Sequence, residues 1–196
     1  MLKNIILMKP LLILILILPL LNFSQKKDCK YDYEEKTDST YLKATNEKLI
    51  YEKVFGNSKE FIQFKLINNN GVPTLSFQFI QKSQDFIPVT CFNNKSKIIL
   101  QLEDGKIISL ISGIDEVCSN LTYIDSEKSN IRLLNGYFLF TKPNYESLKK
   151  SRITIMRVHY AGESKDYIIP DELQSEILNE KVKPSSYFIE NLECIE

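Results

Sequence analysis

The sequence predicts a mainly β protein whose antiparallel sheets form either a sandwich or one strongly curved sheet. Apolar and polar residues alternate along several short segments, as they do in strands that bury one face. Three turn dipeptides, Asn70-Gly71, Asp104-Gly105 and Gly162-Glu163, each lie between two such segments. The segments follow one another without the alternating helices of βαβ units, so the sheets are expected to be antiparallel.

The first 24 residues have the pattern of a signal peptide. Two basic residues, Lys3 and Lys9, precede an apolar run at 10–21. This run is shorter than the roughly 20 residues that a membrane-spanning helix needs. We therefore expect cleavage after Ser24, which leaves residues 25–196 as a single exported β-rich domain in the periplasm or outside the cell. The alternative is a protein that an uncleaved N-terminal helix anchors in the membrane.

The composition argues against a nucleic-acid partner. The 25 Lys and Arg residues balance the 25 Asp and Glu residues, so the chain has neither a basic footprint for nucleic acid nor a polybasic membrane patch. No integral membrane span is expected after removal of the signal peptide. Six glycines leave little room for a phosphate-binding loop, and we expect no cofactor.

Four cysteines predict two disulfides, because an exported chain meets an oxidising compartment. Three pairings are possible. Position favours Cys91–Cys118, which flank the segment 97–111, and Cys29–Cys194, which lie near the two ends of the mature chain. A metal site is a weaker interpretation, because no two cysteines have zinc-ligand spacing and the chain has one histidine. Free buried thiols are the remaining alternative for one pair.

The clearest strand pattern is a hairpin at 61–81 around Asn70-Gly71, preceded by a strand at 49–55. A two-residue turn there places three pairs of apolar residues opposite each other, namely Leu66–Leu75, Phe64–Phe77 and Ile62–Phe79. The other face of the same hairpin is polar. We therefore expect a half-solvated hairpin whose register is set by this contrast, since a slip of one residue would reverse both faces.

A second hairpin is predicted at 97–111. With a two-residue turn at Asp104-Gly105, Leu102 lies opposite Ile107 near the turn, and apolar residues lie opposite each other at the base of the hairpin. In this register the base carries apolar pairs on both faces, and strands of that kind are usually covered on both sides. We therefore expect this hairpin at the centre of the core.

Two short helices are expected in the second half of the chain. One is predicted near Tyr145. The other is a C-terminal helix near Asp171–Val182, where Leu173, Ile177 and Leu178 form an apolar stripe of helical spacing.

A third hairpin, predicted at 152–169 around Gly162-Glu163, carries the only histidine of the chain. Its register opposes His159 to Asp166, which can orient the imidazole as in a nucleophile–His–Asp site, with Ser164 nearby. No hydrolase motif such as G-x-S-x-G accompanies them. A solvated hairpin end is the commoner interpretation, so we expect no catalytic residue and a non-enzymatic protein, with these three side chains as the candidates to check.

Three stretches of the sequence carry a resemblance to known proteins. They are YEKVFGNSKEFIQFKLINNNG at 51–71, KIILQLEDGKIISL at 97–110 with its flanking cysteines, and YFIENLECIE at 187–196. With them the chain resembles a group of uncharacterised small exported proteins of Bacteroidetes-type bacteria, over nearly all of its mature length. The resemblance implies export and a β-rich fold, and it implies no catalytic residues.

These observations favour an exported module that binds a protein or another component of the cell envelope through one face of its sheets. One alternative is a small hydrolase that uses His159 and Asp166. The other alternative is an inhibitor or immunity-type protein, which presents the loop closed by Cys91 and Cys118 to a target enzyme.

Overall fold

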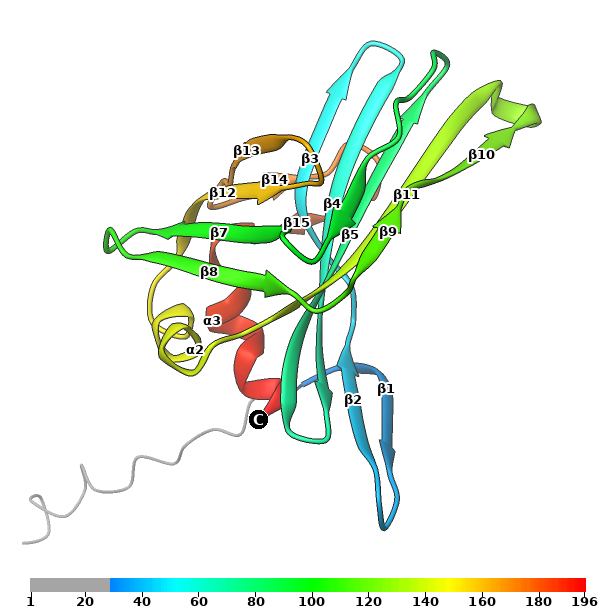
Figure 1. Cartoon of the computed structure of the whole chain (residues 1–196). Coiled ribbons are helices and arrows are strands. Elements are labelled where there is room, and N and C mark those ends of the chain that lie inside the picture. The colour runs from blue at the N-terminus through cyan, green and yellow to red at the C-terminus, as the bar shows by residue number, and fades with distance from the viewer. Residues whose placement is uncertain (1–28) are drawn as a thin grey trace, which may run out of the picture.

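The computed structural model describes residues 29–196, and the predicted signal peptide at 1–24 lies outside them. The described residues form a mainly β protein, as predicted, with one antiparallel sheet of 11 strands and two sheets of two strands. The large sheet is strongly curved and does not close, so the curved-sheet form of the prediction is the correct one (Figure 1). Its strands are β1 (Tyr31–Lys36), β2 (Tyr41–Thr45), β3 (Lys48–Phe55), β4 (Ser58–Asn69), β5 (Val72–Ser83), β7 (Lys97–Leu102), β8 (Ile107–Ser112), β10 (Asn120–Ile124), β11 (Ser129–Leu139), β12 (Ile153–His159) and β13 (Ser164–Ile168).

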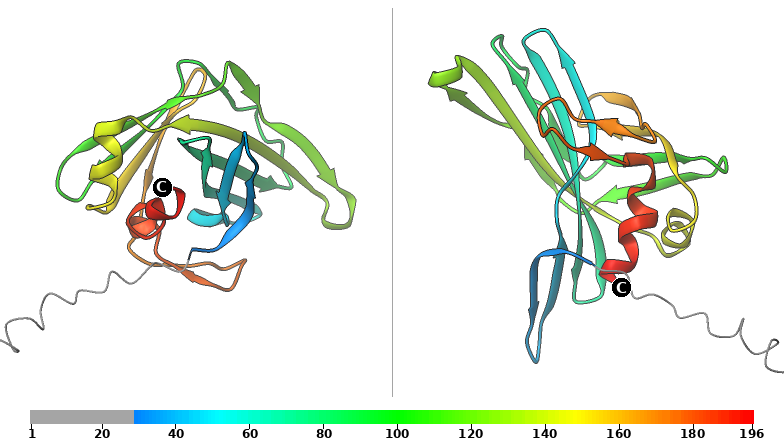
Figure 2. Two further views of the ribbon diagram at one scale, coloured as in Figure 1. Left: turned by 90° about the horizontal axis from the view of Figure 1, so that it is seen from below. Right: turned by 180° about the vertical axis from the view of Figure 1, so that it is seen from behind.

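The remaining elements are short. The small sheets pair β6 (Cys91–Asn93) with β9 (Glu116–Cys118) and β14 (Leu173–Gln174) with β15 (Lys181–Val182). The helical elements are η2 (Asp125–Glu127), α2 (Lys142–Leu148), η3 (Pro184–Ser186), α3 (Tyr187–Asn191) and η4 (Leu192–Ile195). The last three follow one another without a break, and they form a C-terminal helical segment inside the curve of the large sheet (Figure 2).

In two places in the large sheet, two strands pair with the same edge of a third strand. The strand order is β1-β2-β4-β5-β11-β8-β7-β12-β13, and β3 and β10 pair with β4 and β11 outside this path. One edge of β4 pairs with β5. The other edge pairs with β2 at residues 67–69 and with β3 at residues 58–64. β10 and β8 divide one edge of β11 in the same way. The far end of the sheet turns back toward its beginning, and the rings of Tyr51 in β3 and Tyr167 in β13 lie 4.9 Å apart.

The hairpin of β4 and β5 has the predicted register. Leu66 opposes Leu75, and the other two predicted apolar pairs are also formed. All the inward side chains of these pairs are buried, and Phe64 and Phe77 are fully enclosed with ring centroids 5.9 Å apart. The turn at Asn70-Gly71 has positive φ at both residues, as a type I′ turn requires.

The hairpin of β7 and β8 is shifted by one residue from the predicted register. Leu102 accepts a hydrogen bond from the Gly105 N–H and donates one to the Lys106 carbonyl, and Gly105 has a φ of +83°. This is a three-residue loop with a glycine bulge rather than a two-residue turn. The shift exposes Ile107 and Ile111 and buries the alternate residues, so the prediction that both faces are covered is wrong.

The hairpin of β12 and β13 is shifted by two residues from the predicted register. Its turn centres on Ala161-Gly162, because the Tyr160 N–H donates to the Glu163 carbonyl and Gly162 supplies a φ of +101°. A shift of two residues keeps every side chain on its predicted face but changes its cross-strand partner.

The C-terminal helix lies at 184–195 and not at 171–182, where it was predicted, whereas α2 confirms the helix near Tyr145. The segment 171–182 instead contains the hairpin of β14 and β15. Ser175 Oγ accepts the Leu178 N–H at 2.9 Å, and Glu52 of β3 accepts the Ser175 hydroxyl at 2.6 Å. A serine that satisfies nearby backbone donors in this way favours a turn over a helix, and the apolar stripe is left partly exposed.

Both predicted disulfides are confirmed. Cys91 and Cys118 face each other across β6 and β9, with their Cα atoms 4.0 Å apart. Cys29 is joined to Cys194, and the neighbouring Tyr31 donates a hydrogen bond of 2.9 Å to the Cys194 carbonyl. The two ends of the described chain are therefore tied together at the C-terminal helical segment.

The pair of β6 and β9 is tied to the core by Phe92, which is fully buried. Its ring contacts those of Phe138 and Tyr160, each with a centroid distance of 5.2 Å. Gly136 of β11 makes this position possible, because a Cβ at residue 136 would lie 2.7 Å from two ring carbons of Phe92. The core therefore requires the absence of a side chain at this point.

We expect Gly136→Ala to destabilise the protein by about 1–3 kcal/mol, the usual cost of forcing an extra group into a packed core. The measurement is the free energy of unfolding in urea. Gly113→Ala is the matched control, since its added Cβ would meet no atom closer than 3.4 Å. Equal stability of the two variants would contradict the packing of Phe92 on Gly136.

Two buried tyrosines in the hairpin of β12 and β13 share one hydrogen bond. The hydroxyls of Tyr160 and Tyr167 lie 2.7 Å apart, and neither side chain is more than 6% exposed. Burial raises the pKa of both hydroxyls above the ordinary value of tyrosine. Each hydroxyl therefore depends on the other as its partner.

We expect Tyr160→Phe to cost about 1–3 kcal/mol, because it leaves the Tyr167 hydroxyl buried without a partner, and we expect the double variant with Tyr167→Phe to recover most of this loss. The measurement is a double-mutant cycle in urea at pH 7. A double variant less stable than either single variant would contradict it.

The same tyrosines give the wild-type protein a dependence on alkaline pH. Their contribution to stability is fully present below the unfolded pKa of about 10, and it is lost as the pH rises through the raised folded values. The double phenylalanine variant should lack this part of the alkaline decline.

Candidate functional site

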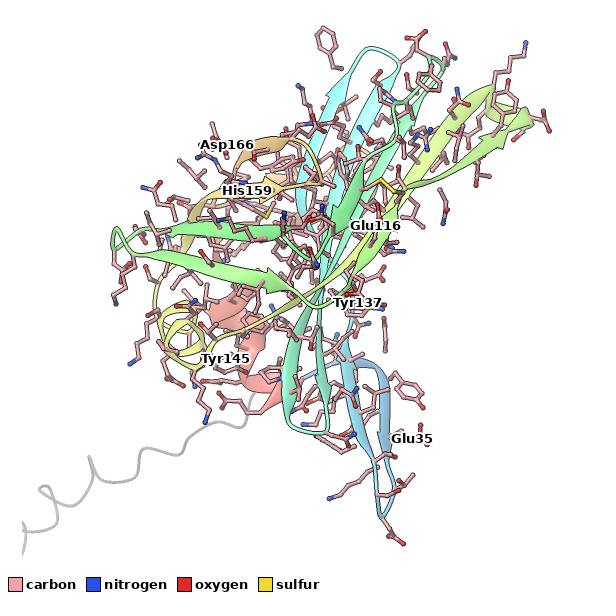
Figure 3. The ribbon with its side chains drawn as sticks, in the orientation of Figure 1. Glu35, Glu116, Tyr137, Tyr145, His159 and Asp166 are labelled. Atoms are coloured by element: carbon pink, nitrogen blue, oxygen red, sulfur yellow. A yellow bond between two sulfur atoms is a disulfide. The ribbon has the colours of Figure 1, made fainter. Side chains whose placement is uncertain are left out.

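The three sequence-predicted candidates lie together on the solvent-facing side of β12 and β13. Figure 3 labels two of them, His159 and Asp166. His159 opposes Ser164, and their Nδ1 and Oγ atoms share a hydrogen bond of 2.8 Å. Asp166 lies one cross-strand pair further along and opposes Arg157. The structure therefore brings the histidine to the serine but gives the aspartate another partner.

Asp166 is bound by Arg157 through two hydrogen bonds. Arg157 Nε and Nη2 donate to Oδ1 and Oδ2, both at 2.6 Å. These bonds hold the pKa of the Asp166 carboxyl below its usual range. The predicted pairing of Asp166 with His159 is therefore wrong, because the turn begins earlier and moves every partner by two residues.

The arrangement lacks the features of a nucleophile–His–Asp site. In such a site one ring nitrogen of the histidine faces the nucleophile and the other is held by a carboxylate. Here Ser164 occupies Nδ1, and His159 Nε2 has no hydrogen-bond partner among residues 29–196. Within the same residues, no group of three His, Cys, Asp or Glu side chains is arranged to hold a metal ion.

The same side of the sheet carries five isoleucines, which we call the isoleucine face. They come from β7, β8, β12 and β13 and are Ile99, Ile107, Ile111, Ile155 and Ile168. The register aligns them in rows across the four strands, and one such row consists of Ile168, Ile155, Gln101 and Ile107. His159 and the Arg157–Asp166 pair lie in the neighbouring rows of the same face.

Four of these isoleucines are well exposed. The exposed fraction is 77% for Ile168, 69% for Ile107, 51% for Ile111 and 37% for Ile155. Isoleucine favours strands, but threonine would serve that purpose on a solvated face without exposing apolar surface. Single exposed apolar residues are ordinary, whereas a group aligned on one face is typical of a contact surface.

The isoleucine face was missed in the sequence because the predicted register turned Ile107 and Ile111 toward a core. The signal that finds it is the loop length at Asp104-Gly105. After two-residue turns, the next commonest hairpin connection is a three-residue loop with the glycine in the left-handed conformation. In the register set by that loop, Leu102 and Leu110 are buried and Ile107 and Ile111 are exposed.

Two adjoining cavities lie away from the candidates above, and the larger one is lined by Cys29 and Cys194. Their volumes are about 270 Å³ and about 440 Å³, and Lys48, Glu190 and Asn191 line both of them. No local motif predicts this site, because its walls come from the two ends of the described chain and from β3.

Comparisons with known proteins identify no relative. No protein-family model matches the chain, and neither curated proteins nor solved structures contain a match. The resemblance to exported proteins of Bacteroidetes-type bacteria therefore stays a prediction. Across residues 29–196, none of the helices has the length and apolar character needed to span a membrane.

We expect no covalent adduct at Ser164 when the protein is treated with a fluorophosphonate probe, because the serine faces Nδ1 and no carboxylate holds Nε2. Intact mass and peptide mapping provide the measurement, with a serine protease treated in parallel as the positive control. An adduct on Ser164 that disappears in His159→Ala would revive the hydrolase hypothesis.

Proposed function

We propose that this protein is an exported, non-enzymatic module that binds a partner protein of the cell envelope through its isoleucine face. The observation that carries the proposal is a set of four exposed isoleucines on one face of β8, β12 and β13, three of which lie in one row. The occupant that fits is a protein with an apolar surface, since an extended sheet face offers area rather than an enclosed pocket.

The charged groups of the face indicate the polarity of the partner. Arg157 and Asp166 neutralise each other, whereas Lys97, which opposes His159 and Ile111, has no carboxylate partner among the described residues. An acidic side chain on the partner would therefore pair with Lys97 at the rim of the apolar contact. Rim charges of this kind contribute more to the association rate and to specificity than to affinity.

Export is supported by the cysteines. All four are paired in the structure, and disulfides persist in oxidising compartments such as the periplasm and the extracellular space. The signal peptide at 1–24 remains a prediction from the sequence.

The inhibitor alternative has one observation in its favour. The hairpin of β7 and β8 projects from the body of the molecule, with its exposed tip at 103–106 (Figure 1). Two hydrogen bonds brace this tip, from the Glu103 N–H to the Arg152 carbonyl and from the Asp104 N–H to Ser151 Oγ. Such a tip is suited to entering the cleft of a target enzyme, and Ile107 at its base belongs to the isoleucine face.

The test is affinity capture from the native envelope fraction after mild cross-linking, with wild-type protein and the double variant Ile107→Thr/Ile168→Thr. We expect a partner that the wild type captures and that the variant captures about tenfold less, since the two most exposed isoleucines are lost. Threonine keeps the strand propensity, and surface changes of this kind usually alter stability by less than about 0.5 kcal/mol.

Val72→Thr is the matched control, because Val72 is 51% exposed on β5, outside the isoleucine face. It should capture the partner as the wild type does. Equal capture by all three proteins would contradict the proposal. A wild-type dimer in solution that the double variant abolishes would also contradict it, because the occupant would then be a second copy of this chain.

A further inference from the structure

The two cavities beside the Cys29–Cys194 disulfide form one groove, since they share Lys48, Glu190 and Asn191. The larger part has a volume of about 440 Å³, within the range of about 300–1,000 Å³ that small-ligand sites occupy. The groove is independent of the isoleucine face, because none of the five isoleucines lines it.

The walls of the groove are packed against the core. Lys48 opens β3, and the next two residues, Leu49 and Ile50, are both buried because a bulge interrupts the pairing with β4 at this point. The opposite wall is the C-terminal helical segment, whose Tyr187 is buried against Phe64 and Phe188. The disulfide holds Cys29 to this segment. A site on such elements keeps its shape without a ligand.

The charge in the groove is mainly positive. Lys30, Lys48 and Lys183 line it, and none of the three has a carboxylate partner among the described residues. Lys181 also lines it but is paired with Glu172 at 2.7 Å, outside the set of lining residues. Glu190 is the one carboxylate among the lining residues, so the groove keeps a net positive charge that favours an anionic ligand.

The groove also offers acceptors for hydroxyl groups. Glu190 lines both parts and has no ion-pair partner within residues 29–196. A carboxylate acceptor repels a purely anionic ligand but binds a ligand that carries hydroxyl donors besides its negative charge.

We propose that this groove binds an acidic saccharide. The ammonium groups of Lys30, Lys48 and Lys183 hold the carboxylates of the ligand, and Glu190 accepts hydrogen bonds from its hydroxyls. An acidic peptide satisfies the lysines equally well but places its carboxylates against Glu190 without supplying hydroxyl donors. The combination of unpaired lysines with an unpaired carboxylate therefore selects the saccharide.

The test uses the purified, oxidised protein and trigalacturonate as the probe, with binding measured by titration calorimetry at low salt. Maltotriose serves as the neutral saccharide and triglutamate as the acidic peptide. We expect trigalacturonate to bind at least about tenfold more tightly than either. Equal or tighter binding of triglutamate would assign the groove to acidic peptides, and absence of trigalacturonate binding at millimolar concentration would overturn the proposal.

Three variants locate the binding in the groove. Lys48→Met should weaken trigalacturonate binding by about tenfold, the loss expected for one charge-assisted hydrogen bond. Lys95→Met, a lysine of the turn before β7, is the matched control and should leave binding unchanged. Glu190→Gln should weaken the saccharide and strengthen triglutamate. Stronger saccharide binding by Glu190→Gln, or an unchanged affinity in Lys48→Met, would show that the groove does not act as proposed.

Discussion

The apolar inner face of β4 and β5 is the surface on which the rest of the molecule packs. Its paired side chains are fully enclosed, although a single hairpin cannot cover them. The cover comes from two directions. Phe92 packs on Phe77 from the small sheet of β6 and β9, and Tyr187 and Phe188 pack on Phe64 from the C-terminal segment. Each disulfide ties one of these two covers in place.

Along this inner face the rows change from apolar to polar. Beyond Ile62 and Phe79, the next pair is Glu60 and Gln81, which share a hydrogen bond of 3.2 Å. Lys165 of β13 reaches across the opening and binds Glu60 at 2.7 Å. This ion pair therefore joins the last strand of the sheet, β13, to β4. Because β13 is an edge strand, its inward-pointing lysine also disfavours the addition of further strands there.

The two proposed surfaces use different parts of this construction. The isoleucine face is the outer side of the strands whose inner side closes the core, so its shape depends on the packing of Leu100, Met156 and Val158 beneath it. The groove depends instead on the junction of β3 with the C-terminal segment. The two proposed sites share no residue, so a partner protein and a saccharide would not compete for the same side chains.

The sequence by itself determined the β class and the register of β4 and β5, and it favoured the disulfide pairing that the structure shows. Alternation with an Asn-Gly turn leaves one register for the first hairpin, because a slip would bury Lys65 and expose Phe64. The disulfides followed from the position of four cysteines in a chain with two ends to join. These features depend on residues that are close in sequence or few in number.

The tertiary structure alone decided the registers of the other two hairpins, the place of the C-terminal helix and both candidate sites. Where Ile residues occupy both faces, the apolar pattern does not select a register, and the loop geometry at Gly105 and Gly162 decides it. Ser175 formed a turn because Glu52, 123 residues away, accepts its hydroxyl. The lysines of the groove come together for the same physical reason, since contacts between distant segments are set by how the sheet curves and not by local propensity.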